Sequence, residues 1–274
     1  MSRHLFIFGY GHIGAALASQ ARASGYTISA TARTADKRQA LDQQGVQAVD
    51  PADATALAEA MTANAMLVTP APGDDGCPAF LAMAGLGARP GWTGYLSTTG
   101  VYGDRGGGWV FEDSELRPTS DEGRRRVLAE QQWLGLGAHI FRLPGLYGAG
   151  RNVLLRLRDG SARRVDKPGH VFSRLHHDDC ATALMASLAR PRPGGIYNLC
   201  DDEPASPDDV LQFAAQLAGI ALPSFSDVTP AMVRFYADNK RVSNALAKAE
   251  LGWRPRYPSY REGLRALYLL LQKD

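Results

Sequence analysis

The chain has 274 residues, of which 45% are hydrophobic and 21% are charged, a composition typical of a globular protein. The formal net charge is only +2, with acidic and basic residues mixed along the sequence, which argues against a nucleic-acid or membrane-surface partner. The sequence shows no apolar run of membrane-spanning length, no signal-peptide pattern and three widely spaced cysteines without a CxxC motif, so we expect a cytoplasmic protein without disulfides.

Short apolar runs alternate with helical segments through the first half of the sequence. We expect strands over residues 5–8, 26–32, 46–49, 65–69, 95–97 and 139–143, and helices over 13–24, 36–44 and 53–62. This alternation predicts parallel βαβ units with right-handed crossovers. The expected fold class is therefore α/β, with a Rossmann-type doubly wound parallel sheet.

The pattern is less regular after residue 147, and two amphipathic helices are expected later, over 208–218 and 260–271. We therefore expect a dinucleotide-binding Rossmann domain over 1–150, to which 171–200 return. Residues 151–170 and 201–274 are expected to form a smaller C-terminal substrate lobe. Because ligands of open α/β sheets bind at the carboxyl ends of the strands, such a lobe would close over that edge.

A GxGxxG motif runs from Gly9 to Gly14, directly after the first expected strand and at the start of the first expected helix. Gly9 permits the tight turn, Gly11 lets the backbone approach a pyrophosphate, and Gly14 lets helix and strand pack closely. The helix N-terminus then offers free N–H groups to the phosphates. The cofactor-binding residues predicted here are Gly9, Gly11, His12, Ile13 and Gly14.

The residues that end the second strand bear on the choice between NAD and NADP. NAD enzymes usually carry Asp or Glu there, whereas this chain reads Thr31-Ala32-Arg33-Thr34. Either Arg33 holds the 2′-phosphate of NADP, which is the cofactor we expect, or it is a solvated loop residue and NAD is possible. Asp50, at the end of the third strand, either contacts the adenine or caps the following segment.

Several later segments resemble one known family in the same order along the chain. They are residues 96–103, with the sequence LSTTGVYG, and then 142–148, 173–179, 197–199 and 251–253. In these segments the chain resembles the extended and atypical short-chain dehydrogenases/reductases, the NAD(P)-dependent epimerase/dehydratase family. Within that family it is most similar to the YeeZ-like bacterial group.

The resemblance implies an oxidoreductase, epimerase or dehydratase that acts on a nucleotide-sugar-like or polar metabolite. It gives Thr98 the role of bonding the reacting oxygen, although Thr98 could equally be a strand-end residue bonded to backbone. Tyr102 is the next catalytic candidate. The nicotinamide half of the cofactor is expected along Thr69, Pro70, Ala71, Ser97, Leu143 and Pro144. The substrate's phosphates are expected near Arg151, Asn152 and Arg174.

The sequence departs from the family at the proton-transfer pair, a Tyr and a Lys four positions apart. Glu122 occupies the tyrosine position and Arg126 the lysine position. If they share a helix, they either form a surface ion pair or Glu122 acts as a general base. The missing pair leaves open a non-catalytic NADP(H)-binding sensor or interaction protein.

No metal site is predicted, because neighbouring side chains in the HHDD segment, 176–179, would point to opposite faces of a strand. The partner expected is a small-molecule substrate, and the chain is expected to be a monomer or a homodimer.

Overall fold

The computed structural model describes residues 3–86, 89–227 and 236–272. The chain divides into two compact units. The first unit comprises residues 1–98, 124–142 and 180–197, and the second comprises 99–123, 143–179 and 198–274. Four segments that the sequence placed in the Rossmann domain therefore lie in the second unit, namely residues 99–123, 143–150, 171–179 and 198–200. Among the described residues, no helix combines the length and the hydropathy needed to cross a membrane.

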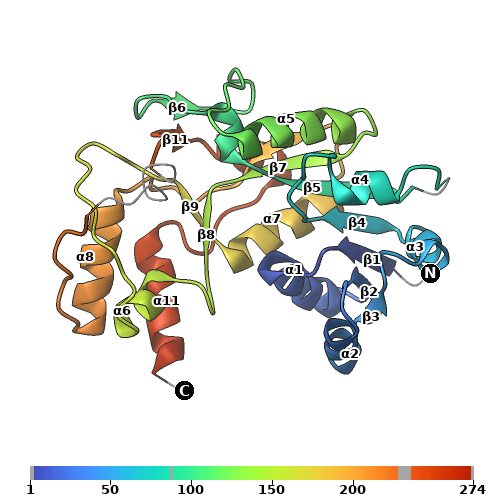
Figure 1. Ribbon diagram of the computed structural model, residues 1–274, viewed down its shortest axis with the longest axis horizontal. Coiled ribbons are helices and arrows are strands. Elements are labelled where there is room, and N and C mark those ends of the chain that lie inside the picture. Colours follow the sequence, from blue (N-terminus) through green and yellow to red (C-terminus); the bar gives the residue numbers. More distant parts are fainter. Residues whose placement is uncertain (1–2, 87–88, 228–235, 273–274) are drawn as a thin grey trace. The chain divides into compact units, whose positions relative to one another are not determined.

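The first unit is built on a seven-stranded parallel sheet in the order β10-β7-β5-β4-β1-β2-β3 (Figure 1). Its strands are β1 (Arg3–Phe8), β2 (Tyr26–Thr31), β3 (Gln47–Val49), β4 (Ala65–Val68), β5 (Trp92–Thr98), β7 (His139–Leu143) and β10 (Ile196–Asn198). The order reverses beside β1, which creates the switch point where open α/β sheets bind ligands. The predicted α/β fold class is confirmed, and β10 comes from the returning segment.

Helices cover both faces of this sheet. They are α1 (His12–Ala23), α2 (Ala35–Gln43), α3 (Ala54–Ala60), α4 (Pro78–Ala82), α5 (Asp121–Leu134) and α7 (His177–Ala189). Figure 1 shows α1 and α7 on one face and α4 and α5 on the other. Phe6, Tyr95 and Trp133 belong to the buried cluster between the sheet and α3, α4 and α5. The apolar run of β1 is buried on both faces, as expected for a central parallel strand.

The second unit contains η1 (Thr99–Tyr102), β6 (Trp109–Val110), β8 (Gly145–Tyr147), α6 (Val153–Arg158), β9 (Arg174–His176), α8 (Pro207–Ala218), β11 (Arg241–Val242), α10 (Ala245–Leu251) and α11 (Tyr260–Leu271). Parallel pairing of β6 with β11 ties residues 109–110 to the C-terminal part of the chain. This long-range pairing explains why 99–123 belong to this unit. The core of the unit packs α6, α8 and α11 around Leu154, Leu211 and Leu264.

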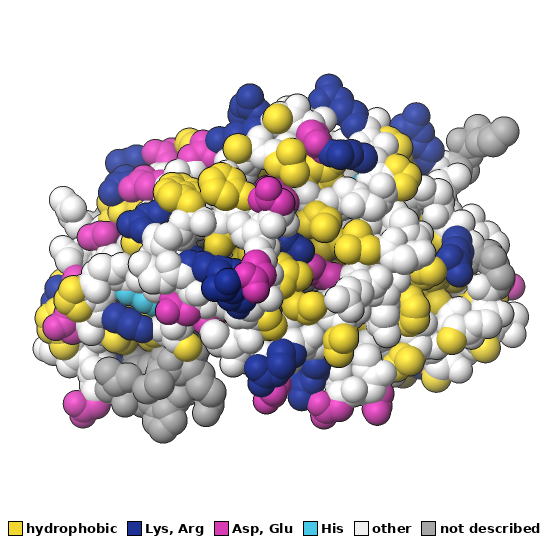
Figure 2. All heavy atoms as spheres, turned by 90° about the horizontal axis from the view of Figure 1, so that it is seen from above, with side chains coloured by type: hydrophobic (Ala, Val, Ile, Leu, Met, Phe, Trp, Pro, Cys, Tyr) yellow, Lys and Arg dark blue, Asp and Glu magenta, His cyan; other side chains and the backbone are white. Residues whose placement is uncertain are grey.

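Helix boundaries in both units follow local sequence signals. Asp53 caps α3 by accepting bonds from the N–H groups of Thr55 and Ala56. Helix α11 starts with a capping box between Ser259 and Glu262. On the face drawn in Figure 2, Lys and Arg side chains are interspersed with acidic, polar and apolar ones.

Candidate functional site

The glycine-rich turn at the end of β1 has a backbone that a larger residue would disturb. Gly9 has φ of +87°, and a Cβ there would lie 2.5 Å from Thr69 Oγ1. The Gly9 N–H donates to Thr31 Oγ1 at 2.8 Å, and the Thr69 hydroxyl donates to the Gly9 carbonyl at 2.7 Å. A Cβ at Gly14 would lie 3.2 Å from Ile7 Cγ2, so this glycine lets α1 pack closely on β1.

The start of α1 has the features of a phosphate cradle. Gly11 is the N-cap residue and provides no side-chain cap, so the first N–H groups of the helix are left to another acceptor. A Cβ at Gly11 would meet no atom within 4 Å, so the space in front of the helix is open. His12 is exposed and Ile13 is buried. These features fit a dinucleotide pyrophosphate held by backbone donors.

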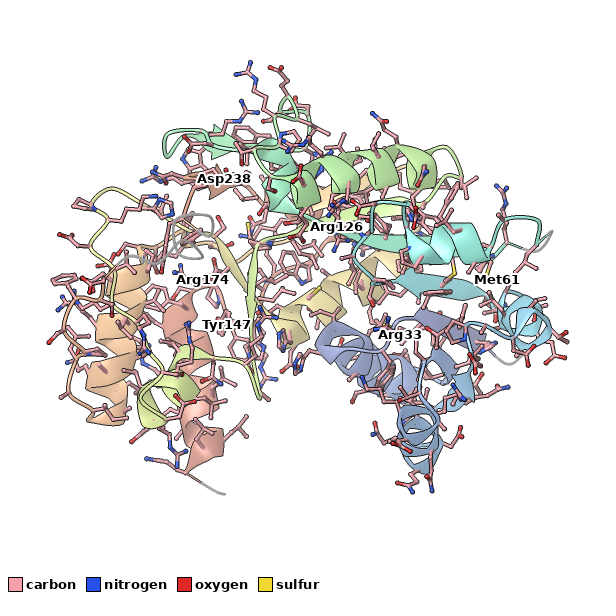
Figure 3. All side chains as sticks on the ribbon, in the orientation of Figure 1. Arg33, Met61, Arg126, Tyr147, Arg174 and Asp238 are labelled. Atoms are coloured by element: carbon pink, nitrogen blue, oxygen red, sulfur yellow. The ribbon has the colours of Figure 1, made fainter. Side chains whose placement is uncertain are left out.

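Two arginines lie near the end of β2 in different electrostatic settings. The Arg33 side chain is exposed, with no ion pair or hydrogen bond to another described residue (Figure 3). Arg38 instead donates to the carbonyls of Ala32 and Arg33 and pairs with Asp50 at 2.9 Å. The predicted adenine contact, Asp50, is therefore engaged by a cation that sequence reasoning missed. Arg33 remains the available cation for a 2′-phosphate.

A buried polar network holds the carboxyl end of β5. Ser97 Oγ donates to Glu130 Oε1 at 2.5 Å, and Arg142 donates to the same carboxylate, with Nη2 2.8 Å from Oε2. The side chains of Arg142 and Glu130 are only 3% and 2% exposed. Thr98, the next residue along β5, is half-buried and already has an interaction of its own. The network fixes the strand end from which Thr98 projects.

Arg126 points into the first unit, as Figure 3 shows. Its Nη1 donates to the Leu96 carbonyl at 2.6 Å and to the Tyr95 hydroxyl at 3.2 Å. Burial raises the pKa of Tyr95 to about 12, although the nearby Arg126 opposes the rise. The predicted ion pair with Glu122 does not form, because Arg126 is buried and Glu122 is exposed in the first turn of α5.

Tyr102 lies buried in the second unit. Its hydroxyl donates to Asn198 Oδ1 at 2.7 Å, and the Asn198 N–H donates to Glu112 Oε1 at 2.8 Å. Donation of the Tyr102 hydroxyl proton to a substrate would require this hydrogen bond to break. The predicted catalytic residues thus fall in both units, with Thr98 and Arg126 in the first and Tyr102 and Glu122 in the second.

The predicted substrate-binding residues line one cavity of about 830 Å³ in the second unit. Asn152 caps α6 there, because its Oδ1 accepts from the Leu155 N–H and its Nδ2 donates to the Gly148 carbonyl, both at 3.0 Å. Arg151 is exposed, and Arg174 is half-buried. Sequence reasoning missed three further arginines of this lining, Arg156, Arg158 and Arg163.

The structure brings most predicted cofactor residues to one edge of the sheet. Gly9, Arg33, Asp50, Thr69 and Ser97 lie at or just beyond the carboxyl ends of β1 to β5. Pro70 and Ala71 follow β4 directly, and β7 ends at Leu143 just before Pro144. This edge beside the switch point is where a Rossmann sheet places its ligand.

Sequence comparisons cover part of the chain. Residues 4–69 match the family model described as NADP oxidoreductase coenzyme F420-dependent, a stretch that includes the glycine-rich turn and strands β1 to β4. A Streptomyces protein named 3-diazoavenalumate denitrifying reductase is 28% identical over 152 residues. That match covers 51% of this chain and 49% of the Streptomyces protein, so the chain spans about half the length of this curated relative.

Comparison of structures covers the whole chain. A functionally unknown conserved protein from Silicibacter pomeroyi is 40% identical, with 98% of this chain and 99% of that chain covered and a TM-score of 0.89. The chain belongs to the same family as this protein. The chain is an NAD(P)-binding Rossmann protein that resembles the NAD-dependent epimerase/dehydratase family.

More distant structures share the fold of this family. A putative NAD-dependent epimerase/dehydratase from Methylobacillus flagellatus is 24% identical, with 99% of this chain and 100% of that chain covered and a TM-score of 0.79. UDP-glucuronic acid 4-epimerase from Bacillus cereus, in complex with UDP-glucuronic acid and NAD, is 18% identical, with 98% and 99% covered and a TM-score of 0.79.

Proposed function

We propose that the chain is an NADP(H)-dependent oxidoreductase, or an epimerase or dehydratase that transfers hydride as an internal step. Its substrate is a nucleotide-sugar-like or other anionic polar metabolite. The observation that carries the proposal is the open, uncapped glycine turn that starts α1 at the switch point of the sheet. The absence of the Tyr/Lys pair supports the further proposal that the chain belongs to the YeeZ-like atypical group.

The protein's own groups have defined tasks in this proposal. The backbone N–H groups at Gly11, His12 and Ile13 bind the pyrophosphate, and a bound nicotinamide supplies the hydride chemistry. Thr98 hydrogen-bonds the reacting oxygen. Glu122, an exposed carboxylate, takes a proton from the substrate as a general base. Arg126 supports the β5 end through the Leu96 carbonyl.

The role of Glu122 is tested by Glu122→Gln, which keeps the shape of the side chain and removes its charge. We assay NADPH consumption and product formation over a panel of nucleotide sugars and small carbonyl metabolites. Loss of a general base is expected to lower turnover by at least about a hundredfold, with NADPH affinity unchanged. Glu59→Gln, an exposed helical glutamate in the first unit, is the matched control and should retain full turnover. Equal turnover by wild type and Glu122→Gln would contradict the assignment.

Cofactor choice is tested by Arg33→Ala. A guanidinium–phosphate contact contributes about 1.5–3 kcal/mol, so the variant should bind NADPH roughly tenfold to a hundredfold more weakly by calorimetry, with NADH binding nearly unchanged. Arg89→Ala removes the same charge near the opposite edge of the sheet and should have no effect. Gly11→Val, whose side chain fills the open space at α1, is the non-binding reference. Tighter wild-type binding of NADH than of NADPH would overturn the role of Arg33.

A second function, an NADP(H)-binding sensor without turnover, is favoured by one observation. The residue in the lysine position, Arg126, is buried and bonded to Leu96 and Tyr95. If NADPH binds and no compound of the panel turns over, the sensor becomes the better account.

A further inference from the structure

The cavity of about 830 Å³ in the second unit has a largely apolar lining. Its volume lies in the range of small-molecule sites. We call it the α6–α8–α11 cavity, because residues of these helices line it together with residues of β8 and β9. The apolar lining includes Leu146, Val153, Leu155, Phe172, Val210, Leu211 and Leu264, and the rings of Tyr147, Tyr236 and Tyr260 add aromatic surface.

The charged residues around this cavity are nearly all cationic. Four exposed arginines contribute to the lining, and Asp159 is the single acid among the described lining residues. Asp159 already accepts a bond from the Ser161 N–H. A ligand of the α6–α8–α11 cavity is therefore expected to be an anion. The exposed arginines are Arg151, Arg156, Arg158 and Arg163.

A fifth arginine, Arg174, is half-buried and held in one orientation. Its Nη1 donates to the carbonyls of Phe172 and Ala205, each at 2.9 Å. Its Nε and Nη2 have no partner among the described residues, and the buried hydroxyl of Tyr147 has none either. Figure 3 marks both residues, which come from the paired strands β8 and β9. Arg174 therefore offers unused donors at one cavity wall, whereas the Tyr147 hydroxyl is enclosed against Gly263 of α11.

Asp201 leaves the charge of Arg174 available. Both of its carboxyl oxygens are buried and have no hydrogen bond of good geometry to the described residues, although the backbone N–H groups of Arg174 and Glu203 lie close enough to lower its pKa. The groups that interact with it electrostatically are Arg174, Tyr147, Cys200 and Asp202. Burial raises the pKa of Asp201 to about 8, against the opposing effect of Arg174. Near pH 7 the carboxyl is mostly neutral, so it does not neutralise the guanidinium.

The polar lining offers donors but few acceptors. Both side-chain atoms of Asn152 are engaged in capping α6, and Ser173 Oγ accepts from the Val242 N–H. A nucleotide sugar carries many hydroxyl groups that need acceptors once they leave water. An acid with an apolar body needs only a cation and apolar surface. The lining of the α6–α8–α11 cavity has these two features.

We propose that the α6–α8–α11 cavity binds an organic acid with an aromatic or similarly apolar body, whose carboxylate is held by Arg174. As an assignment of substrate class, the inference rests on the proposed function. Binding of the acid itself needs neither cofactor nor turnover, so the two can be tested apart.

The test is calorimetry on the full chain with three probes, 2-naphthoate, its neutral analogue 2-naphthylmethanol, and UDP-glucose. We expect 2-naphthoate to bind more tightly than the other two. Arg174→Gln should weaken 2-naphthoate binding roughly tenfold to a hundredfold, because a charge-assisted bond is lost, and should leave 2-naphthylmethanol unchanged. Arg254→Gln, an exposed arginine outside the cavity lining, should change neither.

Arg174→Lys keeps the test decisive if Arg174→Gln does not fold. It retains the positive charge but loses the planar set of donors, and it should weaken 2-naphthoate roughly twofold to tenfold. The inference is overturned if 2-naphthylmethanol binds as tightly as 2-naphthoate, or if UDP-glucose binds more tightly through Arg174. NADPH titration of the same samples separates the two proposals, because failure of NADPH binding with retained 2-naphthoate binding rejects the proposed function alone.

Discussion

Replacing Arg142 with methionine is expected to lower the free energy of unfolding by about 3–5 kcal/mol. The variant leaves the Glu130 carboxylate, 2% exposed, without the cation that binds it through two nitrogens. Only the Ser97 hydroxyl would remain as a donor among the partners described above. An uncompensated buried charge is among the most destabilising changes that one substitution can make. Urea unfolding at pH 7, followed by tryptophan fluorescence, measures the loss.

A surface ion pair of the same unit provides the matched control. Arg125 pairs with Asp74, whose side chain is 86% exposed. Arg125→Met should change the free energy of unfolding by only about 0–1 kcal/mol, because water and salt already screen that pair. The double variant Glu130→Leu/Arg142→Met should recover much of the stability lost in Arg142→Met, since it leaves no buried charge behind. Similar losses in Arg142→Met and Arg125→Met would show that burial is not the cause.

The Rossmann half of the fold could be predicted because its signals are local. Apolar runs, the glycine motif and stops such as Gly25 lie within a few residues of the elements they define. Gly25 has φ of +84°, which suits the turn that follows α1. The fold class follows from the alternation of these elements, and the position of the glycine turn follows from the first strand.

The buried network could not be predicted, because its members are distant in the sequence. Ser97, Glu130 and Arg142 come from β5, α5 and β7, and only the parallel sheet brings them together. Arg126 was misplaced for a related reason. On α5, residues 126, 129, 130 and 133 are buried, so this arginine lies on the inner face of the helix, whereas Glu122 is exposed in the first turn.

The second unit could be predicted only in part, because its contacts also join residues that are distant in the sequence. Its cavity is built from five separated segments, and the sequence pointed to three of its residues only through a resemblance. One local signal was present, since Asn152 precedes the apolar run VLLRLR and asparagine is a preferred N-cap residue. Residues 99–123 belong to the second unit because β6 pairs with β11. No signal near β6 in the sequence predicts this pairing, since β11 is distant in the sequence.

Asp201→Asn is expected to stabilise the protein at pH 7 by an amount on the order of 4 kcal/mol. In the folded chain the pKa of Asp201 is raised to about 8, so its carboxyl is mostly neutral below that pH. The ordinary pKa of an aspartate is 3.8. At pH values between 3.8 and about 8, the unfolded state has released a proton that the folded state keeps. The free energy of unfolding of the wild type therefore falls by about 1.4 kcal/mol for each pH unit from about 4 to 8. Asparagine matches the neutral carboxyl in shape and carries no proton to lose.

The gain should vanish near pH 4, where the carboxyl is neutral or nearly so in both states, and grow until about pH 8. Asp179→Asn is the control in the same unit. Asp179 is also buried and its pKa is raised too, but the N–H groups of Arg256 and Tyr257, at 2.7 and 3.0 Å, oppose the rise. An amide cannot accept both bonds without turning its NH₂ group toward a donor, so at pH 4 this variant should lose about 1–3 kcal/mol. Urea titrations from pH 4 to 9 measure the free energy of unfolding of both variants and of the wild type. A constant difference between Asp201→Asn and wild type across that range would mean that Asp201 is ionised in the folded chain, and Arg174 would then be neutralised from within.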